Sequence, residues 1–158
     1  MPPRSRHRKP LSVRISFDSK VKPPAIAGGS DPAVILSIGT DIVEVYRIRE
    51  TIARTPRFAT RVFTAREREY CESKGAAAAQ SYAGRFAAKE AFLKALKTGW
   101  RGKITWTDVE ILNDPDGVPH FEISGEAGRL LKALGAEQIH LSISHTAEHA
   151  VAHVILEK

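Results

Sequence analysis

The sequence predicts an α+β fold, in which an antiparallel sheet is combined with one long helix and several short ones. Three observations lead to this prediction: helical periodicity over Ser81–Thr98, a turn signal over Asn113–Gly117, and alternation of apolar and polar residues over Ile139–His145. The 158 residues suffice for one domain. No apolar run approaches the roughly 20 residues of a membrane-spanning helix, so we expect no membrane partner.

The folded region is expected to begin with a strand. Val34–Ile38 is a short, β-branched apolar run of the kind found in buried strands. We expect this strand to end at Gly39-Thr40-Asp41. The apolar residues that follow indicate a turn or a helix, and they are Ile42, Val43, Val45 and Ile48.

A capping box and a run of alanines predict the two central helices. Thr64 and Glu67 have the spacing of a capping box, which predicts a helix over Arg66–Ser73 that Gly75 ends. Ala76–Ala79 is expected to lead into the main helix, because alanine is the best helix former.

The main helix, Ser81–Thr98, carries its apolar residues at three- and four-residue spacing, and Gly99 supplies its stop. After it, Thr105–Leu112 and Val118–Ile123 read as two strands of a hairpin, because Pro115-Asp116-Gly117 lies between them. The remaining expected elements are a helix over Gly125–Leu134 closed by Gly135, a strand over Ile139–His145 and a last strand over Val151–Leu156.

The net charge of the chain resides in its first 30 residues. Seven basic residues and one acidic residue in that segment account for the whole formal charge of +6. Because the segment is rich in proline and poor in apolar residues, we interpret residues 1–33 as a disordered basic extension and 34–158 as the domain. A nucleic-acid or membrane-binding arm, an uncleaved leader and a misassigned start are alternatives.

Cysteine and histidine usage excludes two kinds of site. A single cysteine, Cys71, allows no intramolecular disulfide and no multi-cysteine zinc site. The late histidines lack zinc-ligand spacing and have no acidic or cysteine partner beside them. They are His140, His145, His149 and His153.

Two carboxylates are the strongest candidates for chemistry. Asp41 is expected just past the first strand, where it can contact a ligand or cap the next helix. Glu90 is expected on or beside the apolar stripe of the main helix, where a carboxylate requires a cation or hydrogen bonds. Lys94, four residues later, and a metal ion are the two candidate partners.

Two groups of basic residues can be interpreted either as ordinary solvated charges or as binding sites. The main helix carries Arg85, Lys89, Lys94 and Lys97, which are either solvated charges or the wall of a polyanion pocket. A second group is either a solvated helix face or a docking patch for an acidic protein or nucleic acid. It consists of Arg47, Arg49, Arg54, Arg57 and Arg61, opposed only by Glu50. His145, at the end of a strand, is either structural or directed into a cleft.

Three blocks of the sequence resemble the holo-acyl-carrier-protein synthases, the small class of 4′-phosphopantetheinyl transferases. They are Ile38–Ile48 (IGTDIVEVYRI), Gly84–Gly99 (GRFAAKEAFLKALKTG) and Leu141–His145 (LSISH), in the family's order. The segments FTARE at 63–67 and DGVP at 116–119 also look like family segments. The resemblance runs from about Ile35 to the C-terminus and implies a 4′-phosphopantetheinyl transferase-like fold.

The resemblance implies transfer of the phosphopantetheine arm of coenzyme A to a serine of an apo acyl carrier protein, leaving adenosine 3′,5′-bisphosphate. It assigns Asp41 and Glu90 to a magnesium ion that acts on the pyrophosphate of coenzyme A, and it directs Lys94 toward the same phosphates. Magnesium suits one or two protein carboxylates, with waters and phosphates completing its shell. Glu90 is also a candidate base for the serine hydroxyl. Further candidate coenzyme A contacts are Arg85, Lys89 and His145.

The resemblance also implies partners. The family's carrier-docking arginines fall on Arg47, Arg54 and Arg57, which would bind an acidic acyl carrier protein. A cytoplasmic homotrimer acting in fatty acid biosynthesis is implied. A small nucleic-acid-binding module is the alternative from another class, but the sparse aromatics, 7% of residues, and the lack of a recognition motif argue against it. A non-catalytic coenzyme A-binding regulator would require a defect at Asp41 or Glu90, and both are present.

Overall fold

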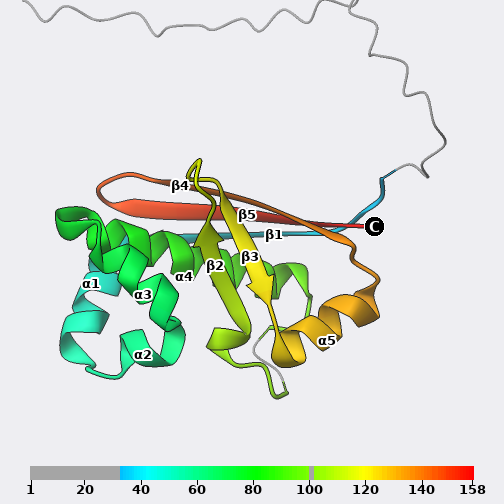
Figure 1. Ribbon diagram of the computed structural model, residues 1–158, viewed down its shortest axis with the longest axis horizontal. Coiled ribbons are helices and arrows are strands. Elements are labelled where there is room, and N and C mark those ends of the chain that lie inside the picture. The colour runs from blue at the N-terminus through cyan, green and yellow to red at the C-terminus, as the bar shows by residue number, and fades with distance from the viewer. Residues whose placement is uncertain (1–32, 100–101) are drawn as a thin grey trace, which may run out of the picture. The chain divides into compact units, whose positions relative to one another are not determined.

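The computed structural model describes residues 33–99 and 102–158. Within these residues, two antiparallel sheets and five α-helices confirm the α+β class (Figure 1). The larger sheet has the strand order β1 (Ile35–Glu44), β5 (His149–Glu157), β4 (Gln138–His145). The smaller sheet is the hairpin of β2 (Val109–Asn113) and β3 (Pro119–Ile123). The extension expected over residues 1–33 falls almost wholly outside the described residues and stays a prediction.

The long helix α4 (Ala78–Ala95) is the centre of the fold. It packs on one face of the larger sheet, with the hairpin crossing it on another side (Figure 1). Its neighbours at one end are α1 (Val45–Arg54), α2 (Phe58–Val62) and α3 (Ala65–Glu72), and α5 (Gly125–Leu134) lies at the other end. No helix in the described ranges is sufficiently long and apolar to cross a bilayer.

Alanines and a glycine let the sheet approach α4 closely. On β5, every second residue from Ala150 to Leu156 is buried against the helix. On β1, a Cβ atom placed on Gly39 would lie 1.9 Å from the carbonyl oxygen of Ala91 and 2.8 Å from the backbone nitrogen of Ala95. Only glycine therefore fits at position 39, because the backbone of α4 itself occupies the space of a side chain.

Several sequence predictions are confirmed. Thr64 and Glu67 form both hydrogen bonds of a capping box at the start of α3. The hairpin forms around Asn113–Gly117, and α5 has the predicted bounds. Gly135 closes α5 in the left-handed conformation, with φ 78°.

Other boundaries were wrong. The first strand does not end at Gly39-Thr40-Asp41 but continues to Glu44, because these residues keep their pairing with β5. The strand expected from Thr105 begins only at Val109, since Thr105 caps a short 3-10 helix, η2 (Trp106–Asp108). Sequence periodicity also missed α2, which at five residues is too short to show a helical repeat.

The main helix starts and ends earlier than predicted, at Ala78 and Ala95 rather than at Ser81 and Thr98. A second 3-10 turn, η1 (Gly75–Ala77), precedes it. The helix stops before Gly99 because Lys97 already has a left-handed backbone, with φ 59°. Its buried residues extend well beyond the expected apolar stripe, since sheet, hairpin and α3 cover it from several sides.

We predict that Gly39→Ala lowers the free energy of unfolding by about 3 kcal/mol, because the added methyl group would overlap the backbone of α4. Urea denaturation measures the change. Gly128→Ala in α5 is the matched control, since its added Cβ would come no closer than 3.7 Å to Ile123. Alanine is also about 1 kcal/mol better than glycine inside a helix. Equal urea midpoints for the two variants would contradict the prediction.

Candidate functional site

Asp41 lies within β1, opposite Ala152 of β5, and its carboxylate meets a lysine of α4. The Nζ of Lys94 lies 2.8 Å from Asp41 Oδ1 and donates a second hydrogen bond to the carbonyl oxygen of Thr40, at 2.9 Å. The interpretation of Asp41 as a helix cap is wrong, because Glu44 occupies the N-cap position of α1.

Asp41 and Glu90 line one cavity of about 290 Å³, which we call the carboxylate cavity. Strand β1 and helix α4 contribute these two residues, which are far apart in the sequence. The rest of the lining is mostly apolar and includes Phe58 and Phe86, while Arg47 lies at the side of α1. A half-buried carboxylate pair beside apolar walls attracts cations strongly, since the walls exclude part of the water.

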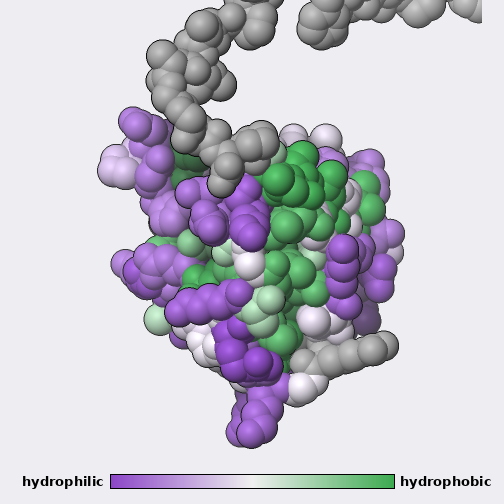
Figure 2. All heavy atoms as spheres, turned by 90° about the vertical axis from the view of Figure 1, so that its right-hand side faces the viewer, coloured by the Kyte–Doolittle hydropathy of each residue, from purple (hydrophilic) through white to green (hydrophobic). Residues whose placement is uncertain are grey.

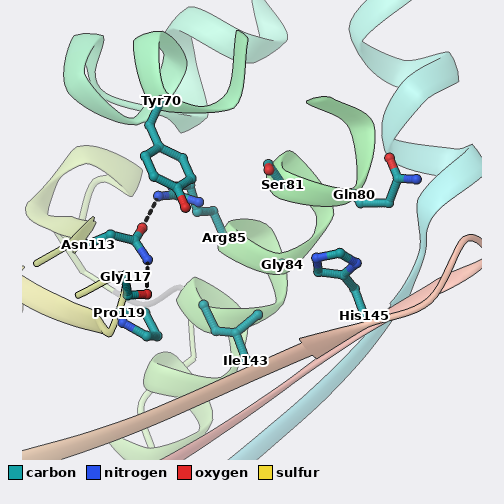
Figure 3. Close-up of a pocket in the computed structure, with 10 residues that line it drawn as sticks. All are labelled: Tyr70, Gln80, Ser81, Gly84, Arg85, Asn113, Gly117, Pro119, Ile143 and His145. Atoms are coloured by element: carbon teal, nitrogen blue, oxygen red, sulfur yellow. Dashed lines mark hydrogen bonds between the residues drawn. The ribbon is translucent and has the colours of Figure 1, made fainter. Parts of the chain in front are cut away.

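A second cavity, of about 160 Å³, opens between α4, the hairpin and β4 (Figure 3). We call it the hairpin cavity. Two of the candidate coenzyme A contacts, Arg85 and His145, line it from different elements. The other lining residues are Tyr70, Gln80, Ser81, Gly84, Asn113, Gly117, Pro119 and Ile143. The arrangement provides a guanidinium, an imidazole and amide groups around one opening, a set that suits an anion.

Arg85 is held in place by two neighbours. Its Nη2 donates to Asn113 Oδ1 at 2.6 Å, and its Cζ lies 3.9 Å from the centroid of the Tyr70 ring. Asn113 in turn donates through Nδ2 to the carbonyl oxygen of Gly117, at 2.8 Å (Figure 3). The hairpin therefore sets the position of the guanidinium in the cavity wall.

Lys89 lies in the interior, fully buried beside the equally buried Glu67. Its Nζ is 2.9 Å from Glu67 Oε2, donates to the carbonyl oxygen of Trp106 at 3.0 Å, and donates to that of Val109 as well. These three partners occupy all three ammonium protons. Burial lowers the pKa of Lys89, and the charge of Glu67 opposes that shift. The structure thus gives Lys89 internal partners in place of an exposed phosphate contact.

The three predicted docking arginines are exposed. Arg47 pairs with Glu44 at 3.1 Å and Arg54 with Glu50 at 3.6 Å, and their side chains are 67% and 77% exposed. Arg57 is exposed at the start of α2. Such exposed pairs hold their arginines only weakly, so the side chains can exchange partners.

Sequence reasoning missed Tyr70 and Asn113. Asn113 was seen only as part of a turn, and its side-chain contact with Arg85 depends on how the hairpin folds over α4. Tyr70 carried no signal, because an aromatic residue in a short helix is usually a core residue. Within the described ranges, no group of three or more His, Cys, Asp or Glu side chains has the geometry of a metal site.

Comparison with known proteins gives one family. The model of the 4′-phosphopantetheinyl transferase superfamily matches residues 37–154. A holo-[acyl-carrier-protein] synthase of Koribacter versatilis is 49% identical over 125 residues, which are 78% of this chain and 99% of that protein. That of Geotalea daltonii is 46% identical over 126 residues, covering 79% of this chain and all of that protein.

Solved structures of holo-[acyl-carrier-protein] synthases share the fold of this chain. The holo-[acyl-carrier-protein] synthase of Neisseria meningitidis superposes with a TM-score of 0.70 at 37% identity, over 79% of this chain and 100% of that chain. The synthase of Bacillus anthracis, solved in complex with CoA (3′,5′-ADP), has a TM-score of 0.64 at 40% identity, over 78% of this chain and 96% of that chain. This chain therefore belongs to the holo-[acyl-carrier-protein] synthases of the 4′-phosphopantetheinyl transferase superfamily.

Proposed function

We propose that this protein transfers the 4′-phosphopantetheine arm of coenzyme A to a serine of apo acyl carrier protein at the carboxylate cavity. The products are holo acyl carrier protein, for fatty acid biosynthesis, and adenosine 3′,5′-bisphosphate. One observation carries the assignment to this cavity: Asp41 from β1 and Glu90 from α4 line the same opening, with Lys94 against Asp41.

The donor set of the carboxylate cavity fits a magnesium ion. Asp41 and Glu90 supply two carboxylates, and magnesium characteristically takes one or two of these, with waters and substrate phosphates completing its shell. Asp41 and Glu90 would hold the ion. When bound, it supplies positive charge to the pyrophosphate of coenzyme A.

Lys94 and Glu90 have separate roles in the proposed transfer. Lys94 holds Asp41 in position and places a fixed positive charge beside the pyrophosphate, which stabilises the departing bisphosphate. Glu90, directly or through a water, accepts the proton of the serine hydroxyl as its oxygen attacks the phosphorus. Transfer breaks the bond between that phosphorus and the bridging oxygen of the pyrophosphate, which leaves with the bisphosphate.

The hairpin cavity is the proposed site for the nucleotide phosphates of coenzyme A. Arg85 and His145 line it, and Arg85 precedes Glu90 on α4 by about 7.5 Å of helix. Five residues also turn the helix by about 500°, so the two side chains leave α4 in different directions, and a ligand with its nucleotide at Arg85 and its pyrophosphate at Glu90 would pass around the helix between them. Lys89 serves the site from inside, by fixing α4 to Glu67 of α3.

We predict that Asp41→Asn and Glu90→Gln each reduce transfer at least about 100-fold, because each removes a charge from the reacting centre. The protein is incubated with coenzyme A, magnesium and an apo carrier protein, and the carrier is weighed by mass spectrometry. Circular dichroism confirms that the variants are folded. Glu137→Gln, at an exposed residue outside both cavities, is the control and should keep the wild-type rate. Wild-type transfer by either site variant would refute this site.

The arginine surface is the proposed dock for the carrier. Arg47, Arg54 and Arg57 are exposed on or beside α1, and Arg47 reaches the carboxylate cavity. An acidic carrier bound there would present its serine to Glu90. Exposed charges accelerate association and make it sensitive to salt.

We predict that Arg54→Glu raises the KM for the carrier several-fold and weakens the salt dependence of kcat/KM, while kcat at saturating carrier is retained. The physical reason is that Arg54 steers the acidic partner without touching the reacting atoms. Steady-state kinetics at two ionic strengths measure both effects. Arg129→Glu in α5 is a matched exposed control. An unchanged KM for Arg54→Glu would count against the dock.

We propose that the chain assembles into the homotrimer that the family resemblance implies, and the outer face of the larger sheet offers apolar surface for contact between copies. Ile38 and Ile42 on β1 are 60% and 66% exposed, and both belong to the face that does not contact α4. Val34 and Ile35, near the start of β1, are also exposed. Figure 2 views the end of the domain where β1 begins and shows hydrophobic surface open between polar side chains. Exposed apolar side chains of this kind favour contact with another protein surface.

We predict that the double variant Ile38→Lys, Ile42→Lys is monomeric, because the added charges would be buried without partners in the assembly. Analytical ultracentrifugation of wild type and variant measures the mass. Ala133→Lys, exposed on α5, is the control and should retain the wild-type mass. A wild-type protein that sediments as a monomer would refute the trimer. We place the activity in the cytoplasm, where coenzyme A and apo carrier proteins meet.

A further inference from the structure

The hairpin beside the hairpin cavity contains a charge conflict. In the pairing of β2 with β3, Glu110 lies directly opposite Glu122. Like charges at such a position push the two strands apart. Glu110 is also buried, whereas the side chain of Glu122 is 51% exposed, so water screens the repulsion from one side only.

Arg66 resolves this conflict from another element. It lies in the first turn of α3, and its Nη2 contacts both Glu110 Oε2 and, at 2.6 Å, Glu122 Oε2. Its Nε donates to Glu110 Oε1 at 3.2 Å. Burial by itself would raise the pKa of Glu110, but hydrogen bonds from Thr64 and Arg66 outweigh it and the pKa is lowered. One exposed arginine thus clamps two opposed carboxylates to α3.

The same hairpin forms one wall of the hairpin cavity. Asn113 ends β2, only three residues after Glu110, and it accepts the hydrogen bond of Arg85. Gly117 and Pro119, in the turn and at the start of β3, also line the cavity. Strand β2 is anchored to α3, because the backbone N–H of Ile111 donates to Glu67 Oε1 at 3.1 Å. Splaying at Glu110 and Glu122 would therefore displace β3 and the turn with Gly117, whose carbonyl oxygen accepts the hydrogen bond that holds the side chain of Asn113.

We propose that Arg66 is a positioning residue for coenzyme A: by clamping Glu110 and Glu122, it holds the two strands of the hairpin together and against α3, so that Asn113 fixes Arg85 in the cavity wall. Arg66 itself does not line the cavity. The inference rests on the proposed function, because it requires coenzyme A in the hairpin cavity.

Arg66→Met is expected to weaken coenzyme A binding roughly 5–10-fold, the scale of coupling between residues in one network. Isothermal titration with coenzyme A measures the affinity directly. In transfer assays the KM for coenzyme A should rise while kcat and the KM for the carrier stay unchanged. Arg129→Met is the matched control, since Arg129 is another exposed arginine paired with a carboxylate through two hydrogen bonds. It should bind as the wild type does.

A rescue experiment isolates the cause. Adding Glu122→Gln to Arg66→Met removes the repulsion that the arginine had balanced, so the affinity should return to within about two-fold of wild type. If Arg66 acted only through the packing of its side chain, and not by balancing the repulsion between the two glutamates, a second substitution on the hairpin would not restore the affinity. Wild-type affinity in Arg66→Met, or weak binding that Glu122→Gln fails to repair, would overturn the proposal.

A conservative variant covers loss of folding. Should Arg66→Met fail to fold, Arg66→Lys is titrated instead, because it retains the charge but a single ammonium cannot reproduce the fork of hydrogen bonds. We expect weaker binding, and wild-type affinity would overturn the proposal. The wild-type titration separates the two levels: a wild-type protein that does not bind coenzyme A refutes the proposed function, whereas normal binding by every variant refutes only the role of Arg66.

Discussion

The close contact between β1 and α4 at Gly39 is the constraint on which the rest of the structure depends. The helix backbone occupies the space where a side chain at position 39 would be, so the absence of a side chain allows the strand to pack directly against the helix. Asp41 follows two residues later, so its carboxylate comes within 2.8 Å of Lys94. Glu90 shares the resulting cavity. The close packing of the two backbones therefore brings Asp41 and Glu90 into the lining of the carboxylate cavity.

The buried pair of Lys89 and Glu67 holds the same helix from another side. Lys89 immediately precedes Glu90, and its three internal hydrogen-bond partners bind α4 to α3 and to the segment that enters the hairpin. Rotation of α4 would break these contacts, since a buried charge without its partners is costly. Neighbouring residues therefore divide two tasks, with Lys89 holding the helix and Glu90 facing the cavity. On α3, Arg66 contacts the hairpin, while Glu67 contacts both α4, through Lys89, and the hairpin, through the backbone N–H of Ile111.

Much of the fold could be predicted because its signals are local. The capping box at Thr64, the turn after Asn113 and the C-terminal glycine of α5 each depend on a few consecutive residues. The signals failed where packing decides. Gly39 was interpreted as the end of a strand, although it is there for the approach of α4. Lys89 was interpreted as a phosphate contact, since a sequence does not show which side of a helix another element will cover.

The sequence by itself determined the class of fold, because this follows from residue types at short spacing, and the family resemblance of its three blocks implied the candidate residues Asp41, Glu90 and Lys94. Only the tertiary structure decided which of them share a cavity, that Lys89 lies inside the protein, and that Arg66 clamps two opposed glutamates. The physical reason is that burial and ion pairing depend on contacts between segments distant in the chain, and no local pattern encodes those contacts.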